Sequence, residues 1–381
     1  MIDLSYINGK CYGCSACKNI CPKDAIAMQM DACGFLVPVI DKKKCIDCGL
    51  CDEVCPIDHL IKKDNVPQVY AAINKNESVL LKSSSGGVFT AISDWILKEN
   101  GVVFGAVYNA EKKMVEHVLA ETTEQRDCMR GSKYVQSDIQ ESFRQIKHLL
   151  NIGKKVLFVG TSCQINGLYN YLGMEKYINL VTCDIICHGV ASPLVFKRNV
   201  EFLEKKHRVK INTIDFRNKK AGWSIPHPVA ITNDKEIPFD FYTKMYYKDF
   251  ALRENCYHCP YADINRIADI TIGDFWGIEK ANLSIDYEKG CSLILVNSKK
   301  GEALLENIKK DLIIQKSSIE QCMQKNLKEP TERPTGRDAF WKDFWNLNTE
   351  EIASKYGEYG IRGKVRVLIR KCKNKVREIF R

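Results

Sequence analysis

Eight cysteines near the N-terminus are the residues whose type and spacing point most directly to chemistry. They form two runs with the same pattern, C-x2-C-x2-C-x3-C-P, and each member of the first run recurs at a constant interval in the second. Cysteine thiolates at this spacing are the ligands of paired 4Fe-4S clusters in bacterial proteins. The runs are Cys11, Cys14, Cys17 and Cys21 before Pro22, and Cys45, Cys48, Cys51 and Cys55 before Pro56.

The spacing also predicts which cysteines share a cluster, because three thiolates of one run bind one cube and the fourth binds the other. The alternative is a zinc ribbon. A zinc ribbon needs two cysteine pairs and a longer gap, and it does not account for the third cysteine or the proline. The predicted ligand sets are Cys11, Cys14, Cys17 and Cys55 for one cluster, and Cys45, Cys48, Cys51 and Cys21 for the other.

The segment between the two runs predicts how the chain positions them. Residues 25–40 read as two alternating strands around a turn at residues 31–34. Cys33 lies in that turn and is interpreted as a bystander. We expect the proline after each run to turn the chain into a short helix. Residues 1–62 are therefore predicted to form an α+β ferredoxin-like module with two clusters.

Four later cysteines can build a third cluster. Cys163 and Cys187 each follow a predicted strand, and Cys256 and Cys259 form a C-x2-C pair. The carboxyl ends of neighbouring strands in an open α/β sheet converge on one crevice, so these thiols could bind a further 4Fe-4S cluster. Buried structural thiols are the alternative. Ordinary core or surface positions are expected for Cys128, Cys183, Cys291, Cys322 and Cys372.

A Ser/Gly loop at residues 82–87 runs into a predicted helix. Gly86 and Gly87 free the backbone to curl, and the unpaired N–H groups of the helix with three hydroxyls could hold a phosphate or pyrophosphate. A plain N-cap is the alternative. The chain has no G-x-G-x-x-G after a strand and no Walker A sequence, so neither a Rossmann dinucleotide site nor a P-loop is expected.

The elements that must position these residues follow from apolar periodicity. Strand-like runs alternate with amphipathic stretches of helical length, which predicts an α/β body with a mixed sheet, in two parts at residues 68–152 and 153–328. A helical tail is predicted at residues 337–381. Strands are expected at residues 68–73, 101–108, 114–120, 155–160, 179–187, 211–216, 229–232, 267–272 and 292–297, and helices at 87–100, 138–151, 162–172, 193–206, 301–310 and 318–325.

Composition and charge exclude several classes of protein. The 381 residues carry 18 cysteines and a net charge of +10, but residues 362–381 contribute nine Lys/Arg and one Glu, which leaves 10 − 8 = +2 elsewhere. A basic excess at one terminus does not predict nucleic-acid binding. The start of the chain lacks signal-peptide features, so a cytoplasmic location is expected. Residues 365–381 predict a basic amphipathic helix that could lie on the inner membrane face, on a partner or on the body.

Seven segments of the body, in order, resemble the coenzyme F420 hydrogenase/dehydrogenase beta-subunit family. The resemblance spans roughly residues 70–330, and a ferredoxin module is a frequent companion in that family. The order of the segments carries the resemblance. They are residues 84–87 (SSGG), 131–137 (GSKYVQS), 160–164 (GTSCQ), 187–192 (CHGVAS), 216–223 (FRNKKAGW), 256–259 (CYHC) and 273–277 (GDFWG).

The resemblance implies an iron–sulfur flavoprotein that holds FAD in a flavoprotein-type body, with a third cluster near the flavin. It implies that Cys163, Cys187, Cys256 and Cys259 are the ligands of that cluster; Cys183 is an additional nearby thiol. His188 and Asp184 could relay protons, and Lys133 could stabilise the reduced ring. The residues implied on the flavin side are Ser84, Ser85, Gly86, Gly87, Thr90, Lys133 and Tyr134.

The sequence therefore predicts an oxidoreductase that passes electrons between a low-potential carrier or redox partner subunit and a small-molecule acceptor. The route runs through 4Fe-4S clusters and FAD, because a flavin converts between one-electron and two-electron chemistry. The acceptor is coenzyme F420 by resemblance, or another small molecule. The alternative is a non-catalytic iron–sulfur subunit that connects larger redox partners.

Overall fold

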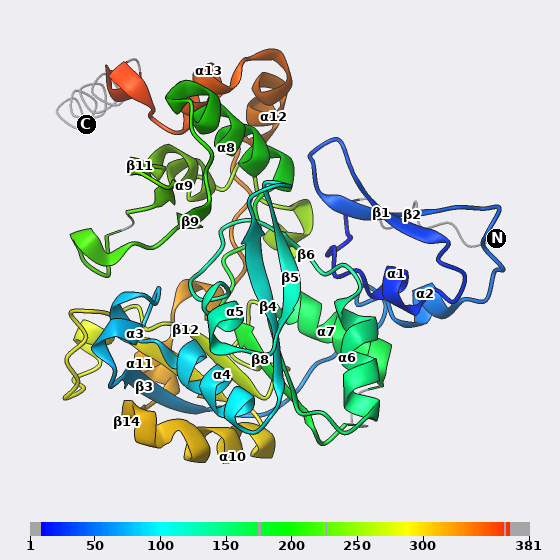
Figure 1. Ribbon diagram of the computed structural model, residues 1–381, viewed down its shortest axis with the longest axis vertical. Coiled ribbons are helices and arrows are strands. Elements are labelled where there is room, and N and C mark those ends of the chain that lie inside the picture. Colours follow the sequence, from blue (N-terminus) through cyan, green and yellow to red (C-terminus); the bar gives the residue numbers. More distant parts are fainter. Residues whose placement is uncertain (1–8, 174–176, 226, 362, 366–381) are drawn as a thin grey trace, which may run out of the picture.

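The structure, a computed structural model, describes residues 9–173, 177–225, 227–361 and 363–365. Its N-terminal domain, residues 9–62, projects from one side of the larger body (Figure 1). Strands β1 (Ile26–Met30) and β2 (Leu36–Ile40) pair antiparallel around the predicted turn. The Asp31 carboxylate holds this turn by accepting hydrogen bonds from the backbone N–H groups of Cys33 and Phe35.

The short helices of this domain lie before the prolines, so the prediction of a helix after each proline is wrong. Helix α1 (Ala16–Ile20) and helix α2 (Leu50–Glu53) each contain the third cysteine of their run. Cys21 is already extended, with φ −64° and ψ 115°. The ring of a proline disfavours the helical conformation of the residue before it, which ends α1 at this point.

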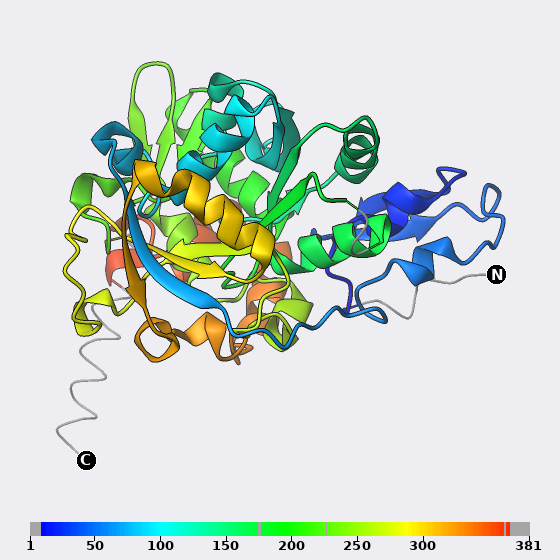
Figure 2. The same cartoon turned by 90° about the horizontal axis from the view of Figure 1, so that it is seen from below.

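The body is built on one nine-stranded mixed sheet, in the order β14-β3-β13-β12-β8-β7-β4-β5-β6 (Figure 2). The four central strands β12, β8, β7 and β4 are parallel, and antiparallel strands flank them. Both predicted parts of the body contribute strands to this sheet. The strands are β3 (Gln68–Asn74), β4 (Val102–Asn109), β5 (Met114–Ala120), β6 (Ser137–Asp138), β7 (Val156–Gly160), β8 (Leu180–Ile185), β12 (Ile270–Asp274), β13 (Ser292–Val296) and β14 (Leu312–Ser317).

Helices cover both faces of the sheet because its central strands are apolar on both sides. Phe104 and Phe158 pack with α6 and α7 on one face, whereas Val103 and Leu157 pack with α4 and α10 on the other. Successive residues of a strand point to opposite faces, which produces this division. The helices around the sheet are α3 (Glu77–Leu81), α4 (Val88–Lys98), α5 (Thr123–Asp127), α6 (Ser142–Asn151), α7 (Ser162–Leu172), α10 (Lys299–Ile308) and α11 (Ile319–Cys322).

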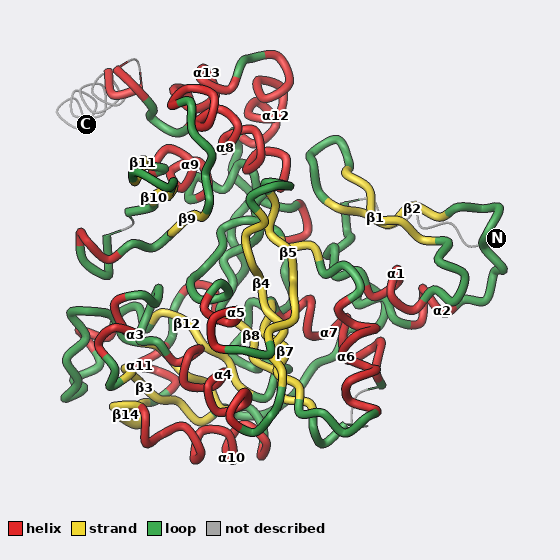
Figure 3. The backbone as a smooth tube through the Cα atoms, viewed as in Figure 1, coloured by secondary structure: helices red, strands yellow, loops and turns green. Residues whose placement is uncertain are grey.

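A second layer of helices and a small sheet sits above the edge of the main sheet (Figure 3). The first part of the predicted helical tail packs against the body, because Phe340 and Phe344 are buried in this layer. This layer contains β9 (Thr213–Asp215), β10 (Val229–Ile231), β11 (Glu236–Pro238), α8 (Pro193–His207), α9 (Asp240–Tyr246), α12 (Arg337–Asn346) and α13 (Thr349–Tyr356).

The predicted basic amphipathic helix at residues 365–381 lies, apart from Val365, outside the described residues. Within the described ranges, no helix has both the length and the apolar character that crossing a bilayer requires.

The N-terminal domain docks on helices α6 and α7 of the body. Arg144 of α6 donates to the carbonyl oxygens of Asn19 (2.6 Å) and Cys21 (2.8 Å). Asn170 of α7 donates to the carbonyl oxygen of His59 at 2.9 Å. The two parts are therefore tied by hydrogen bonds that reach the backbone next to a cysteine run.

Candidate metal centres and cofactor site

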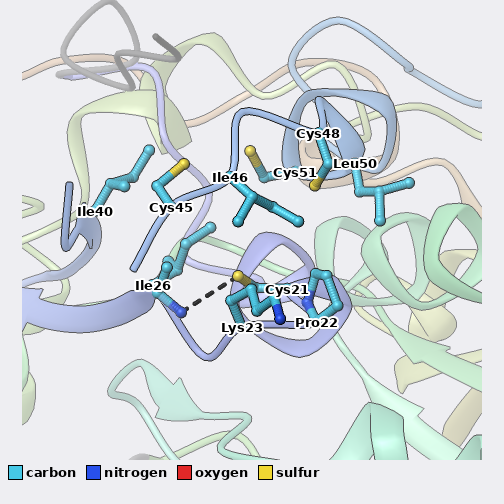
Figure 4. A pocket seen from close by; sticks show the side chains of 11 residues that line it. Cys21, Pro22, Lys23, Ile26, Ile40, Cys45, Ile46, Cys48, Leu50 and Cys51 are labelled. Atoms are coloured by element: carbon cyan, nitrogen blue, oxygen red, sulfur yellow. Dashed lines mark hydrogen bonds between the residues drawn. The ribbon is translucent and has the colours of Figure 1, made fainter. Parts of the chain in front are cut away.

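Cys21 lies with the second cysteine run around one pocket of the N-terminal domain (Figure 4). This outer cysteine set, Cys21, Cys45, Cys48 and Cys51, lines a hollow of about 360 Å³ together with Ile26, Ile40 and Ile46. The backbone N–H of Ala25 donates to Cys21 Sγ at 3.3 Å. Cys48 and Ile46 are exposed, so this set faces away from the body. These are the four cysteines that the spacing groups, and their role as ligands of one cluster stays a prediction.

The remaining N-terminal cysteines form an inner cysteine set, Cys11, Cys14, Cys17 and Cys55. Burial, followed by the charge of Cys17, raises the pKa of Cys14 well above its ordinary value. Burial, followed by the charges of Cys11 and Cys55, likewise raises the pKa of Cys17. The four thiols are thus close enough to influence one another electrostatically. A buried thiolate needs a compensating positive charge, which iron supplies on binding.

The body brings Cys163, Cys187, Cys256 and Cys259 around one cavity of about 550 Å³, a grouping named here the body cysteine set. Cys163 lies in the first turn of α7 and Cys187 follows β8. Cys256 lies in the 3-10 helix η3 (Glu254–His258), and Cys259 comes directly after it. Burial raises the pKa of Cys163 to about 12 and that of Cys256 to about 11. Burial also raises the pKa values of the other two thiols.

Local sequence explains how these thiols reach the cavity. Thr161 and Gln164 form a capping box that starts α7 directly after β7 and so fixes Cys163. Thr161 Oγ1 lies 3.1 Å from Cys163 Sγ. Gly189 has φ +134°, and a Cβ there would lie 2.9 Å from Leu252 Cδ1, so only glycine allows the turn after Cys187. Cys183 is buried within the core of the sheet and does not line the cavity.

The cavity also contains side chains that sequence reasoning missed. Tyr12, Arg253 and Thr331 line it beside the thiols. Arg253 also donates to the carbonyl oxygens of Cys11 (3.4 Å) and Leu36, so it joins the cavity to the N-terminal domain. The positions of Tyr12 and Arg253 close to predicted ligands were the only signal available in the sequence.

The two predicted proton carriers are placed differently. His188 lines the cavity, and its Nε2 lies 2.6 Å from Asp249 Oδ1. Asp184 is fully buried in an ion pair with Arg266 at 2.8 Å, and its Oδ2 also accepts from Ser162. Asp184 thus holds the ends of β7 and β8 together below the cavity, whereas His188 is the one that reaches it.

The Ser/Gly loop closes against the ends of β3, β12 and β13. Ser84 Oγ accepts from the Ser132 backbone N–H at 2.9 Å, and Ser85 Oγ donates to the Cys291 carbonyl at 2.8 Å. A Cβ on Gly86 would lie 2.1 Å from the Ala72 carbonyl oxygen, so this position admits no side chain. Gly87 starts α4 with φ +82°, and no described side chain caps the N–H groups of that helix.

The two loops implied on the flavin side meet here. Ser132 contacts Ser84, and Arg130 Nε donates to Thr90 Oγ1 at 3.1 Å on the first turn of α4. Lys133 Nζ donates to four backbone carbonyl oxygens, of residues 128–131, although burial lowers its pKa to about 7. Lys133 thus holds its own loop, and Arg130, which the sequence did not single out, is the cation beside the α4 terminus.

Tyr134 connects this loop to the cavity wall. Its ring stacks on Tyr246 at 4.7 Å, and Tyr246 donates to the carbonyl oxygen of Gly189, two residues after Cys187. Arg217 lies 3.3 Å from the Tyr134 hydroxyl and pairs with Asp274 at 3.0 Å. These residues come from the segments of the family resemblance or from α9, so those segments converge in space.

These residues fit both kinds of implied group. Each cysteine set contains four thiols that lie near one another. Four thiolates are the ligands that a 4Fe-4S cube takes, so each set fits one cube. The uncapped α4 terminus with Arg130 fits a phosphate-bearing cofactor such as FAD. The described cysteines are all free thiols. Among the described residues, no three His, Cys, Asp or Glu side chains converge tightly enough to hold a single metal ion.

Comparisons with known proteins agree with the resemblance. Residues 153–321 match the family described as the C terminus of the coenzyme F420 hydrogenase/dehydrogenase beta subunit, and residues 10–59 match the 4Fe-4S dicluster domain. No curated protein matches the chain. A structure titled as a xenon derivative of the F420-reducing [NiFe] hydrogenase complex from Methanosarcina barkeri is similar at 17% identity and a TM-score of 0.46, covering 78% of this chain and 93% of that one.

Proposed function

Since this chain joins a 4Fe-4S dicluster domain to the C-terminal domain of the coenzyme F420 hydrogenase/dehydrogenase beta-subunit family, we propose that it is an iron–sulfur flavoprotein oxidoreductase. It is an iron–sulfur protein with a general oxidoreductase role. The proposal adds three 4Fe-4S clusters, FAD and a small-molecule acceptor to that role.

The observation that carries the proposal is the convergence of the body cysteine set in one cavity. Its four thiols come from three separate stretches of sequence, and the lining also includes Tyr12 of the N-terminal domain. Thiols that are buried only for packing would have no reason to meet in one cavity from three separate stretches of sequence. The body cysteine set is therefore proposed to hold the third cluster, next to the inner cysteine set.

The residues of the Ser/Gly loop are proposed to hold FAD. When bound, FAD converts between one-electron and two-electron transfer. The N–H groups of α4 and the guanidinium of Arg130 would bind its pyrophosphate, and Gly86 would keep the loop close to the sheet. Lys133 would fix the loop that presents Tyr134. His188, held by Asp249, would exchange protons at the cavity.

The proposed electron source is a low-potential carrier or a redox partner subunit, and the proposed acceptor is coenzyme F420 or another small molecule. One observation favours the second candidate, a non-catalytic electron-transfer subunit. Ser84, Ser85 and Lys133 already form hydrogen bonds within the chain, so these polar groups have partners other than a cofactor.

Cofactor analysis of the anaerobically purified full-length chain separates the two candidates. We expect about twelve irons per chain, at four irons per cube, together with bound FAD. The double variant Cys256→Ser with Cys259→Ser should lose only the iron of the third cluster. Full iron without flavin would establish the electron-transfer subunit instead. An iron content that the double variant does not change would show that these cysteines are not ligands.

A further inference from the structure

We propose that electrons cross between the two parts of the molecule at a single point, from the inner cysteine set to the body cysteine set, through the contact of Cys14 and Tyr12 with helix α7. The outer cysteine set then exchanges electrons with the external carrier. This inference rests on the proposed function, because it assumes a cluster at each of the three cysteine sets.

The first observation is the contact between Cys14 and Gly167. A Cβ added to Gly167 would lie 2.8 Å from Cys14 Sγ and 3.0 Å from Cys14 Cβ, so the backbone of α7 touches a ligand of the inner set. Cys163 precedes Gly167 by one turn of the same helix, a rise of about 6 Å. Helix α7 therefore contacts one predicted ligand and carries another.

The second observation is Tyr12, which follows Cys11 in the chain and lines the cavity of the body set. Its ring meets the ring of Tyr261 edge to face, with centroids 5.7 Å apart. Tyr261 follows Cys259 by two residues. One apolar cluster contains Cys14, Tyr12, Tyr261, Cys163 and Cys259. Packed side chains thus connect the inner set to the body set beside the cavity that the body set lines.

The outer set has no comparable connection among the described residues. The side chains of Cys21 and Cys51 pack in an apolar cluster of their own domain, and Cys48 and Ile46 are exposed. The body contacts Cys21 at its backbone, where Arg144 donates to the carbonyl oxygen at 2.8 Å, a polar contact in place of the packed rings beside the inner set. The N-terminal domain projects so that its outer end lies away from the body (Figure 2). The arrangement gives an order of transfer: carrier, outer set, inner set, body set.

The step itself is a simple exchange. One electron leaves the reduced cluster of the inner set, which is oxidised, and enters the oxidised cluster of the body set, which is reduced. No bond forms or breaks and no proton moves. A low-potential one-electron carrier supplies the electron.

The test measures how fast the body cluster becomes reduced. The full holoprotein is mixed anaerobically with a reduced bacterial two-cluster ferredoxin and frozen at intervals, and each cluster is followed by electron paramagnetic resonance. The signal of the body cluster is assigned by its absence from the Cys256→Ser, Cys259→Ser variant. Gly167→Ala adds a methyl group against Cys14, and because alanine favours helix over glycine, any loss comes from that contact. Tyr12→Leu removes the ring.

We expect both variants to keep their iron and to lose the prompt reduction of the body cluster, while the N-terminal clusters are still reduced promptly. The matched controls Tyr12→Phe, which keeps the ring, and Asn170→Ala, which removes docking hydrogen bonds one turn along α7, should behave as the unaltered protein. Prompt body-cluster reduction in both Gly167→Ala and Tyr12→Leu would overturn the inference.

If the Gly167→Ala variant loses iron, a second measurement tests the same order of electron transfer. In the fully reduced protein, the magnetic broadening of the body-cluster signal should survive removal of the outer cluster by Cys48→Ala. It should be lost whenever the inner cluster is lost. Broadening that disappears with the outer cluster would contradict the proposed order. If no body-cluster signal exists at all, the proposed function itself fails, which is a distinguishable result.

Discussion

The N-terminal domain and the body hold their cysteines in opposite ways. In the N-terminal domain the ligands are themselves much of the core, because the buried cluster consists of Ile26 and Cys51 with Cys11, Cys17 and Cys21 packed against them. In the body, Cys163 and Cys259 pack at the margin of a large core of aliphatic and aromatic side chains, and all four thiols of the body set line one cavity. We therefore expect the first region to need its metal in order to fold, whereas the second has its cavity without one.

Removal of iron should have the largest effect, and it should affect the two regions differently. Binding free energy becomes folding free energy where ligands form the core, so the N-terminal domain should lose its whole structure when its clusters are removed. The sheet of the body should persist. Limited proteolysis and circular dichroism of the chelator-treated protein would show a stable fragment beginning near residue 63. Equal loss of both regions would mean that the body also depends on iron.

Substitution of Arg266 tests the stability of the body, which should not depend on iron. Arg266→Leu leaves the Asp184 carboxylate buried without its partner, which should cost about 3–5 kcal/mol of the unfolding free energy of the body. Urea unfolding followed by tryptophan fluorescence would measure this loss. The double variant Arg266→Leu with Asp184→Leu removes both charges and should recover much of it. No recovery would show that the ion pair is not the cause.

Substitution of Gly86 should have a smaller effect that is confined to the proposed cofactor loop. Gly86→Ala forces the loop away from the Ala72 carbonyl and should cost about 1–3 kcal/mol. We expect loss of bound flavin with unchanged iron, measured by absorbance of the extracted cofactors. Ser85→Ala is a second probe of the same loop, since it removes the hydrogen bonds of the Ser85 hydroxyl to the carbonyl oxygens of Gly273 and Cys291 without adding an atom. Flavin retained by Gly86→Ala would remove the loop from the proposed site.

The smallest expected effect is a dependence of body stability on pH. Burial lowers the pKa of His117 on β5 from 6.5 to about 4. The unfolded chain binds a proton in this range while the folded body does not, so stability is constant above pH 6.5 and falls as the pH decreases towards 4. At pH 5.5 the loss should be about 1.4 kcal/mol relative to pH 7.5. The variant His117→Phe should lack this component, and an identical pH dependence in that variant would contradict the assignment.

Local patterns in the sequence predicted local structure well. The helix at residues 162–172 was predicted with the bounds of α7, because a capping box begins it and Gly173 ends it. The grouping of Cys21 with the second cysteine run also followed from spacing. Strand β14 was missed. It is an edge strand, and its polar residues interrupt the alternation of apolar residues by which a strand is predicted. Helix α9 was missed as well.

Contacts between distant segments were beyond the reach of the sequence. The interpretation of Asp184 as a residue that could relay protons did not include Arg266, which lies 82 residues from Asp184 and pairs with it. Lys133 was assigned to the flavin. In the structure its ammonium donates to backbone carbonyl oxygens of the turn after α5, and only the folded turn brings these oxygens around it. Nothing in the residues around Gly167 indicated that Cys14 would lie against it.

The position of β3 has a consequence for synthesis of the protein. This strand pairs only with β13 and β14, whose residues follow it by more than two hundred positions. Chains fold from the N-terminus as they leave the ribosome. The eight thiols of the two cysteine runs thus emerge and can receive iron long before β3 finds its neighbours. Proteins that assemble clusters would then meet an N-terminal domain that already holds its clusters, attached to a sheet that is still incomplete. The cavity of the body cysteine set would form only later.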